Sequence, residues 1–148
     1  MKKIVFINSI IFTILFAFAT QKSFSQTPDE KEAIKSTALN YIEGWYSADS
    51  ARMAKALSPE LKKKGFIVNP KNNKLMIYDA TYSQMIEWTS KKPNELKQNP
   101  NIKIEVEINE VGKNIAIVKT ISPEFTDYIQ MGKIKGEWKI FNIVWEQK

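Results

Sequence analysis

The chain has 148 residues, with 22 Lys and Arg against 16 Asp and Glu, and it contains neither cysteine nor histidine. Without cysteine there is no disulfide, thiol nucleophile or thiolate metal site, and without histidine there is neither a Ser-His-Asp triad nor a His-based zinc site. The composition therefore excludes the commonest hydrolytic and zinc-dependent mechanisms, and the fold must be held together by its core.

The first 25 residues are typical of a secretory signal peptide. Lys2 and Lys3 provide the positive start, residues 4–19 are almost wholly apolar, and Ser23 and Ser25 supply the small residues of a cleavage site. A retained membrane anchor is the alternative, but the apolar run is shorter than the ~20 residues that span a bilayer. We therefore expect cleavage of residues 1–25, export to the periplasm or the medium, and no membrane association afterwards.

Residues 26–148 are expected to form a single domain, since 123 residues without a repeat or a linker suit one core. Removing the three lysines of the signal segment leaves 19 basic and 16 acidic residues, a net charge of +3. We interpret the remaining positive clusters, at 62–64 and 91–92, as solvent-exposed surface. Nucleic-acid binding is therefore not predicted.

A long helix is predicted at the start of this domain. Thr27 can cap it, Pro28 suits its first position, and Glu30 completes a capping box. Apolar residues then recur at helical spacing, at Ile34, Ala38, Tyr41, Ile42 and Trp45. Asp49 predicts the cap of a second short helix, and the segment 59–65 is predicted to add a further helical turn.

A small hairpin and a third helix follow in the prediction. The β-prone runs 66–68 and 75–78 flank a stretch of Pro, Asn and Lys, which indicates a hairpin. Asp79 or Thr81 can cap the next helix. Its apolar positions are Tyr82, Met85, Ile86 and Trp88. Residues 90–101 are predicted to form a polar loop.

The last third of the chain predicts a meander of strands. Residues 102–108 alternate apolar and charged side chains, which indicates one buried and one exposed face. Further strands are expected over 115–121, 125–134 and 137–145, the last two joined by a tight turn at Lys135-Gly136. Helices that precede an antiparallel sheet define the α+β class, and we expect a strongly bent sheet wrapped around the first helix.

Two stretches of the chain carry a family resemblance. The first is Tyr41-Ile-Glu-Gly-Trp-Tyr-Ser-Ala-Asp49, and the second is Asp127-Tyr128 with Gly136-Glu-Trp-Lys-Ile-Phe-Asn-Ile-Val-Trp145. Both resemble the nuclear transport factor 2-like (NTF2-like) superfamily, in particular its branch named putative lumazine-binding. The resemblance implies a cone-shaped α+β barrel, in which helices close a curved antiparallel sheet around a pocket, and a homodimer through the outer sheet face. Members include isomerases, dehydratases and binding proteins without known chemistry.

Asp127 is the strongest candidate for catalysis. Strand alternation places it on the face that carries Phe125, Ile129 and Met131, so its carboxylate lies among apolar neighbours and could act as a general base. The alternatives are a buried carboxylate that a tyrosine or backbone donor satisfies, and an exposed one. Asp/Glu clusters with metal spacing and phosphate-binding loops are absent from the sequence, and no cofactor is predicted.

The remaining candidates are aromatic. The two helices could form an aromatic mouth for a flat ligand, and the last strand could add one of its two faces. One face holds Trp138, Ile140, Asn142 and Val144, and the other holds Lys139, Phe141, Ile143 and Trp145. Lys139 favours the second as the outer face. The predicted ligand-binding set is therefore Tyr41, Trp45, Tyr82, Met85, Asp127, Trp138 and Asn142, with an ordinary aromatic core as the alternative.

Three functions remain compatible with these residues. The first is an exported domain that binds a small flat or apolar ligand in the cone pocket. The second is an Asp127-dependent isomerase or dehydratase of the ketosteroid isomerase or SnoaL-like type, which the resemblance allows. The third is a non-catalytic dimeric interaction domain with a vestigial pocket.

Overall fold

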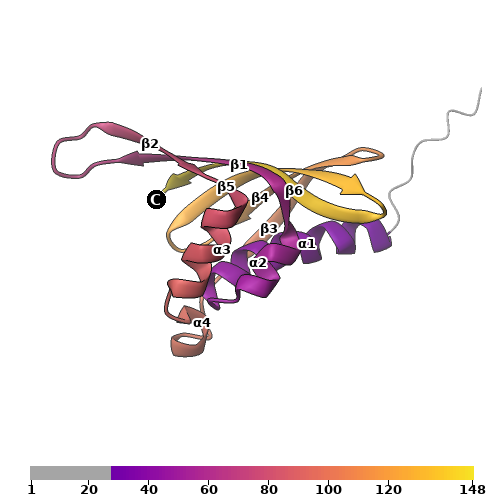
Figure 1. The fold of residues 1–148 in the computed structure, drawn as a ribbon, viewed down its shortest axis with the longest axis horizontal. Coiled ribbons are helices and arrows are strands. Elements are labelled where there is room, and N and C mark those ends of the chain that lie inside the picture. The colour runs from indigo at the N-terminus through magenta and orange to yellow at the C-terminus, as the bar shows by residue number, and fades with distance from the viewer. Residues whose placement is uncertain (1–27) are drawn as a thin grey trace, which may run out of the picture.

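The protein is a curled six-stranded sheet with helices on one face (Figure 1). The computed structural model describes residues 28–148, so the predicted signal segment lies outside the described part. The elements are α1 (Pro28–Tyr46), α2 (Ser50–Ala56), β1 (Leu57–Val68), β2 (Leu75–Ala80), α3 (Tyr82–Lys91), α4 (Glu95–Gln98), β3 (Glu105–Val111), β4 (Ile115–Ile121), β5 (Phe125–Ile134) and β6 (Glu137–Gln147). Across the described residues, no helix is both long and apolar enough to cross a membrane.

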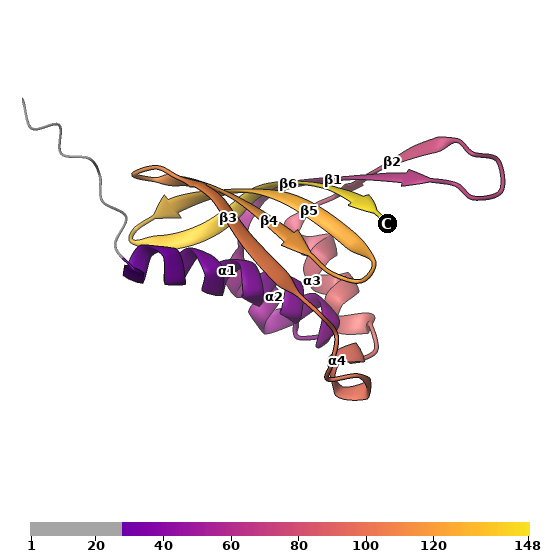
Figure 2. The ribbon, with the colours of Figure 1, turned by 180° about the vertical axis from the view of Figure 1, so that it is seen from behind.

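The strands lie in the order β2-β1-β6-β5-β4-β3, and the sheet is mixed. β1 runs parallel to β6, whereas all other neighbours are antiparallel. The α+β class is confirmed, but the expectation of a wholly antiparallel sheet is wrong, because the chain crosses through β2, α3 and β3–β5 before β6 joins β1. The sheet curls like a cone over the helices without closing into a barrel (Figures 1 and 2).

Helices α2 and α3 begin where their caps predict, whereas Thr27, the cap predicted for α1, lies outside the described residues. Asp49 accepts hydrogen bonds from the backbone N–H of Ala51 and Arg52, both at 3.0 Å, and so starts α2. Thr81 forms a capping box with Gln84 and starts α3. The helical spacing predicted for α1 is confirmed by its buried residues, which are Ile34, Ala38, Tyr41, Ile42, Gly44 and Tyr46.

The segment 59–65, predicted to be a helical turn, is instead part of strand β1. The register between β1 and β6 shifts between Leu57 and Lys62, and Pro59 lies in this irregular stretch. Proline lacks a backbone N–H and is tolerated in a sheet where the ladder is interrupted. Tertiary pairing with β6 thus outweighs the local signal. The predicted loop at 90–101 also contains the short helix α4.

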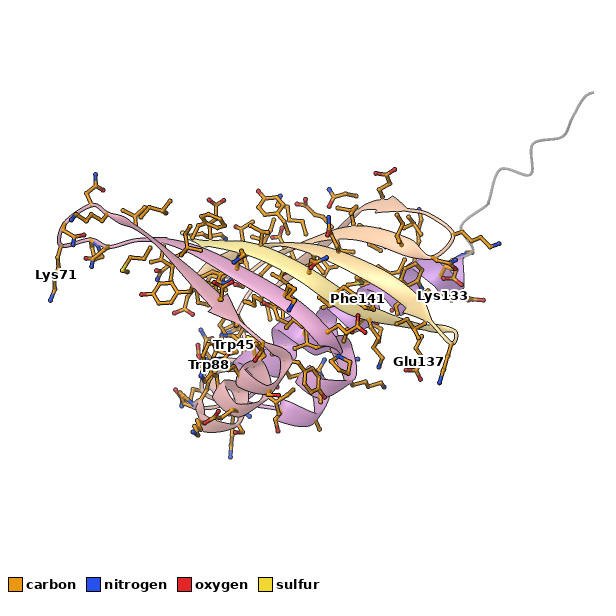
Figure 3. All side chains as sticks on the ribbon, turned by 45° about the horizontal axis from the view of Figure 1, so that its top comes forward. Trp45, Lys71, Trp88, Lys133, Glu137 and Phe141 are labelled. Atoms are coloured by element: carbon orange, nitrogen blue, oxygen red, sulfur yellow. The ribbon has the colours of Figure 1, made fainter. Side chains whose placement is uncertain are left out.

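The β5–β6 hairpin positions the C-terminal half of the site. Its predicted turn is confirmed, since Lys135 has a φ of +50° and Gly136 a φ of +87°. Two successive left-handed residues match the twist of a tight hairpin, and the glycine adopts this conformation at little steric cost. At the other side of the sheet, the β1–β2 hairpin projects beyond the helices as an arm with Lys71 near its tip (Figures 1 and 3).

Candidate functional site

A cavity of about 140 Å³ lies between the helices and the concave face of the sheet. It is lined by Tyr41, Ile42, Trp45, Lys63, Met85, Trp88, Phe125 and Trp145. Three of these residues are tryptophans, and Lys63 carries the only formal charge among them. Figure 3 shows Trp45 and Trp88 together on the helical side of the sheet.

Two helices supply one wall of the cavity. Tyr41 and Trp45 lie one turn apart on α1, and Met85 and Trp88 lie at i and i+3 on α3, so each pair projects from a single helix face. Trp88 is 42% exposed and marks the opening. The indole N–H of Trp45 is buried and has no hydrogen-bond acceptor within residues 28–148. This wall therefore contains one donor that the fold does not satisfy.

The strands supply the opposite wall. Phe125 and Trp145 meet edge to face, with ring centroids 5.1 Å apart and an interplanar angle of 87°. Trp145 lies directly across Gly65, its partner on β1. A Cβ atom on Gly65 would stand 2.3 Å from two carbons of the indole ring, so only glycine lets Trp145 lie flat against β1. The position of this wall thus depends on a glycine.

A buried hydrogen-bonded cluster lies behind the cavity. Asp127 is 1% exposed. Its Oδ1 accepts hydrogen bonds from the Tyr41 hydroxyl at 2.8 Å and from Lys63 Nζ at 3.3 Å. Its Oδ2 accepts from Thr120 Oγ1 at 3.1 Å. Lys63 also donates to the Tyr41 hydroxyl oxygen. Four elements, α1, β1, β4 and β5, therefore converge on one carboxylate whose two oxygens are both occupied.

Burial sets the electrostatics of this cluster. Desolvation lowers the pKa of Lys63, and the nearby charge of Asp127 partly offsets this effect. The pKa of Tyr41 lies well above its ordinary value, first through burial and then through the charge and hydrogen bond of Asp127. Lys63 Nζ lies 4.9 Å from the ring centroid of Tyr41 and 5.2 Å from that of Trp145. Tyr41 therefore remains a neutral donor at physiological pH.

The structure places the predicted site residues in three different settings. Tyr41, Trp45 and Met85 line the cavity. Asp127 lies outside the lining set, behind Tyr41 and Lys63. This arrangement matches the alternative of a buried carboxylate that accepts a hydrogen bond from a tyrosine. Tyr82 is partly buried against the core and is not a lining residue.

The predicted common face of Trp138 and Asn142 is wrong, because β6 contains a bulge. Gln130 pairs with Asn142 and Met131 pairs with Ile140, so Phe141 is an extra residue that resets the alternation. Trp138 stays buried but lies outside the cavity lining, with its indole N–H donating to Glu30 Oε2 at 2.9 Å.

Beyond the bulge the two predicted faces of β6 exchange places. Asn142 is exposed and donates to Gln130 Oε1 at 3.0 Å, so it is not a pocket residue. Ile143 is buried and Trp145 lines the cavity, although both were expected on the outer face. The residue that sequence reasoning placed outside thus forms a wall of the site.

Lys63 is a second site residue that sequence reasoning missed. The cluster 62–64 was interpreted as solvent-exposed surface, which is wrong for Lys63, since it is 9% exposed and lines the cavity. Lys62 and Lys64 point outward. Leu61, Lys63 and Gly65 share the buried face of β1, and this period of two is a signal that a strand assignment would have revealed.

The fold identifies the class of protein. Three solved structures of NTF2-like proteins of unknown function are similar to this chain. The protein from Shewanella baltica OS155 has a TM-score of 0.63 and 23% identity, and the match covers 81% of this chain and 94% of that chain. The proteins from Methylobacillus flagellatus KT and Silicibacter pomeroyi DSS-3 have TM-scores of 0.60 and 0.59 and identities of 20% and 11%, and their matches cover 82% and 81% of this chain and 94% and 97% of the respective proteins. The chain therefore has the NTF2-like fold. The family model described as putative lumazine-binding matches residues 29–146, so the chain belongs to that family. A search of curated proteins gave no match.

Proposed function

We propose that this protein is an exported binding domain for a small, flat and largely apolar ligand. The observation that carries the proposal is the cavity of about 140 Å³ with three tryptophans in its walls. An engineered apolar cavity of about 150 Å³ in another protein binds benzene, so the volume suits one aromatic ring with few substituents. Flat aromatic walls on both the helical and the strand side favour a planar ligand.

The geometry supports binding over Asp127-dependent catalysis. A general base must reach the proton that it abstracts, at hydrogen-bond distance or through one water molecule. Asp127 lies outside the cavity lining, and its two oxygens already accept from Tyr41, Lys63 and Thr120. Within residues 28–148, no group of three or more acidic side chains could hold a metal ion in its place.

The export part of the proposal rests on the signal pattern of residues 1–25, which lie outside the described part of the chain. Intact mass measurement of protein recovered from the cytoplasm, the periplasm and the medium tests it. A mass that corresponds to a chain starting at Gln26 supports export with cleavage. Retention of all 25 residues in the cytoplasm contradicts it.

Calorimetric titration with single-ring aromatic compounds tests the binding function. Met85→Trp adds volume to the cavity wall and is expected to weaken binding of every such compound at least tenfold. Met76→Trp, on the half-buried face of the β1–β2 arm, is the matched control and is expected to bind as the wild type does. Absence of binding to the wild type, or equal binding in Met85→Trp, contradicts the proposal.

We also propose a homodimer through the outer sheet face. Tyr128 and Val144 are partners across β5 and β6 and are 51% and 48% exposed, so the centre of this face is apolar. Lys62 is exposed on β1 to one side of them, and Glu110, which lies in the same cross-strand row, is exposed on β3 to the other. A twofold axis along the strands would place the basic side of one copy on the acidic side of the other. Charge complementarity thus supports a second copy as the occupant.

A further inference from the structure

The cavity has an uneven supply of hydrogen-bonding groups. The Tyr41 hydroxyl donates to Asp127 and accepts from Lys63, so it is engaged in both directions. The Lys63 ammonium has three N–H groups, and its hydrogen bonds use two of them, to Tyr41 and Asp127. The Trp45 N–H has no acceptor within residues 28–148. Among the lining side chains, therefore, donors are left over, whereas the one hydroxyl oxygen already accepts a hydrogen bond.

The charges at the cavity floor are already balanced. Lys63 forms an ion pair with Asp127 at 3.3 Å, with side-chain exposures of 10% and 2%. An anionic ligand would lose its hydration in an apolar site whose single cation is already neutralised, and the loss of hydration is costly. A cationic ligand would lie against the ammonium of Lys63. The cavity is therefore suited to a neutral molecule.

We propose, on the basis of the proposed function, that the cavity selects a neutral single-ring aromatic compound with one hydrogen-bond acceptor, such as a ketone or aldehyde carbonyl. The carbonyl oxygen accepts a hydrogen bond from the unused N–H of Lys63, and the ring packs between the tryptophans of α1, α3 and β6. Lumazine, after which the family is described, has two fused rings and N–H donors of its own. The leftover side-chain groups of this cavity are donors and offer those N–H groups no acceptor, so lumazine is a poor match.

Acetophenone and α-methylstyrene form the matched probe pair, because they differ only in a C=O against a C=CH₂ group. The variant Lys63→Met/Asp127→Asn removes the buried ion pair without leaving an unpaired charge. By calorimetry, the ratio of ketone affinity to hydrocarbon affinity is expected to fall roughly three- to tenfold in this variant, the range for one lost hydrogen bond. Lys64→Met/Asp79→Asn makes the same change in an exposed ion pair and is expected to keep the wild-type ratio.

The outcomes separate the two proposals. If neither probe binds the wild type, the proposed function fails and the inference fails with it. If both bind and the ratio is equal in the wild type and in Lys63→Met/Asp127→Asn, the binding function stands and the inference is overturned. Tighter binding of benzoate or lumazine than of acetophenone overturns the neutral, acceptor-bearing ligand class.

Infrared spectroscopy of bound acetophenone keeps the inference testable if the double variant does not fold. A hydrogen bond from Lys63 lowers the carbonyl stretching frequency below its value in a hydrocarbon solvent. The lowered frequency is expected in the wild type and also in Trp45→Phe, which keeps a ring in the wall but removes the other unused N–H. An unshifted frequency in the wild type, or loss of the shift in Trp45→Phe, overturns the assignment to Lys63.

Discussion

Lys63 has the same side chain as its neighbours Lys62 and Lys64, yet only Lys63 is buried. Strand alternation turns it inward, where Asp127 compensates its charge and two aromatic rings lie within 5.2 Å of Nζ. Removing one partner of a buried ion pair typically costs about 3–5 kcal/mol, because the other charge is left unpaired. One lysine thus connects the stability of the core with the chemistry of the cavity.

Tyr41 gives a pH dependence at the residue scale. Above its ordinary pKa of 10.0, the unfolded chain loses the tyrosine proton while the native state retains it, because burial and Asp127 raise the pKa of Tyr41. The native state then binds more protons, so this residue makes the protein less stable as the pH rises from 10.0 towards the folded pKa. Tyr41→Phe lacks this effect. Its unfolding free energy should therefore fall less steeply with pH than that of the wild type, and the two slopes should differ by up to about 1.4 kcal/mol per pH unit.

Urea unfolding between about pH 9 and pH 11.5 measures the two slopes. The lowered pKa of Lys63 works in the opposite direction, since the unfolded chain keeps its proton up to about 10.5 after the native state has released it. Both proteins retain Lys63, so its contribution cancels to first order. The slope is the readout, because loss of the hydrogen bond to Asp127 changes the stability of Tyr41→Phe at every pH. Equal slopes would contradict the buried, proton-retaining Tyr41.

At the scale of single elements, local signals predicted the helices better than the strands. The caps of α2 and α3 and the turn at Lys135-Gly136 depend on neighbouring residues only, and all three are confirmed. Tyr41, Trp45 and Met85 were found in the same way, because the helical period fixes which face they occupy.

The strands depended on partners distant in the sequence. β1 is held by β6 from across the chain, and the bulge at Phe141 is visible only in the pairing of β5 with β6. A single extra residue exchanges the two faces of a strand, because side chains alternate with a period of two. Lys63 and Trp145 were missed for these reasons, and Asn142 was wrongly placed in the pocket.

The bulge predicts opposite outcomes for two adjacent substitutions in β6. Asn142 is exposed, so Asn142→Val should change the unfolding free energy by less than about 0.5 kcal/mol and leave ligand binding intact. Ile143 is 1% exposed, so Ile143→Asn buries an amide in the core and should cost about 3 kcal/mol or more. Urea denaturation measures both. If Asn142→Val costs more than Ile143→Asn, the side chains of β6 alternate without interruption, and the bulge is contradicted.

At the scale of the whole molecule, the two faces of the sheet are covered differently. The concave face is covered by helices and encloses the cavity, whereas the outer face exposes apolar side chains at its centre, including Tyr128 and Val144. Burying such a patch against a second copy removes apolar surface from water. Dimerisation would also leave the cavity free, because the cavity lies on the opposite face.

The charge pattern makes the dimer testable by exchange of residues. In the proposed arrangement, Lys62 lies near Glu110 of the partner subunit, because the two residues share one cross-strand row, and the contact occurs twice. Lys62→Glu should therefore raise the dimer dissociation constant roughly tenfold, on the scale of two exposed ion pairs, and adding Glu110→Lys to the same chain should restore it. Lys71→Glu makes the same charge change near the tip of the β1–β2 arm (Figure 3) and should have little effect.

Tyr128→Glu tests the centre of the proposed interface. Because it introduces a charge at this exposed position, the variant should be monomeric. Sedimentation velocity over a concentration series measures each dissociation constant, and circular dichroism checks that every variant is folded. Restoration by the double exchange identifies a contact between Lys62 and Glu110 of the partner subunit, since a general loss of stability would not be repaired by a second charge reversal. A wild type that stays monomeric at all concentrations, or a Tyr128→Glu variant that still dimerises, contradicts the outer-face dimer.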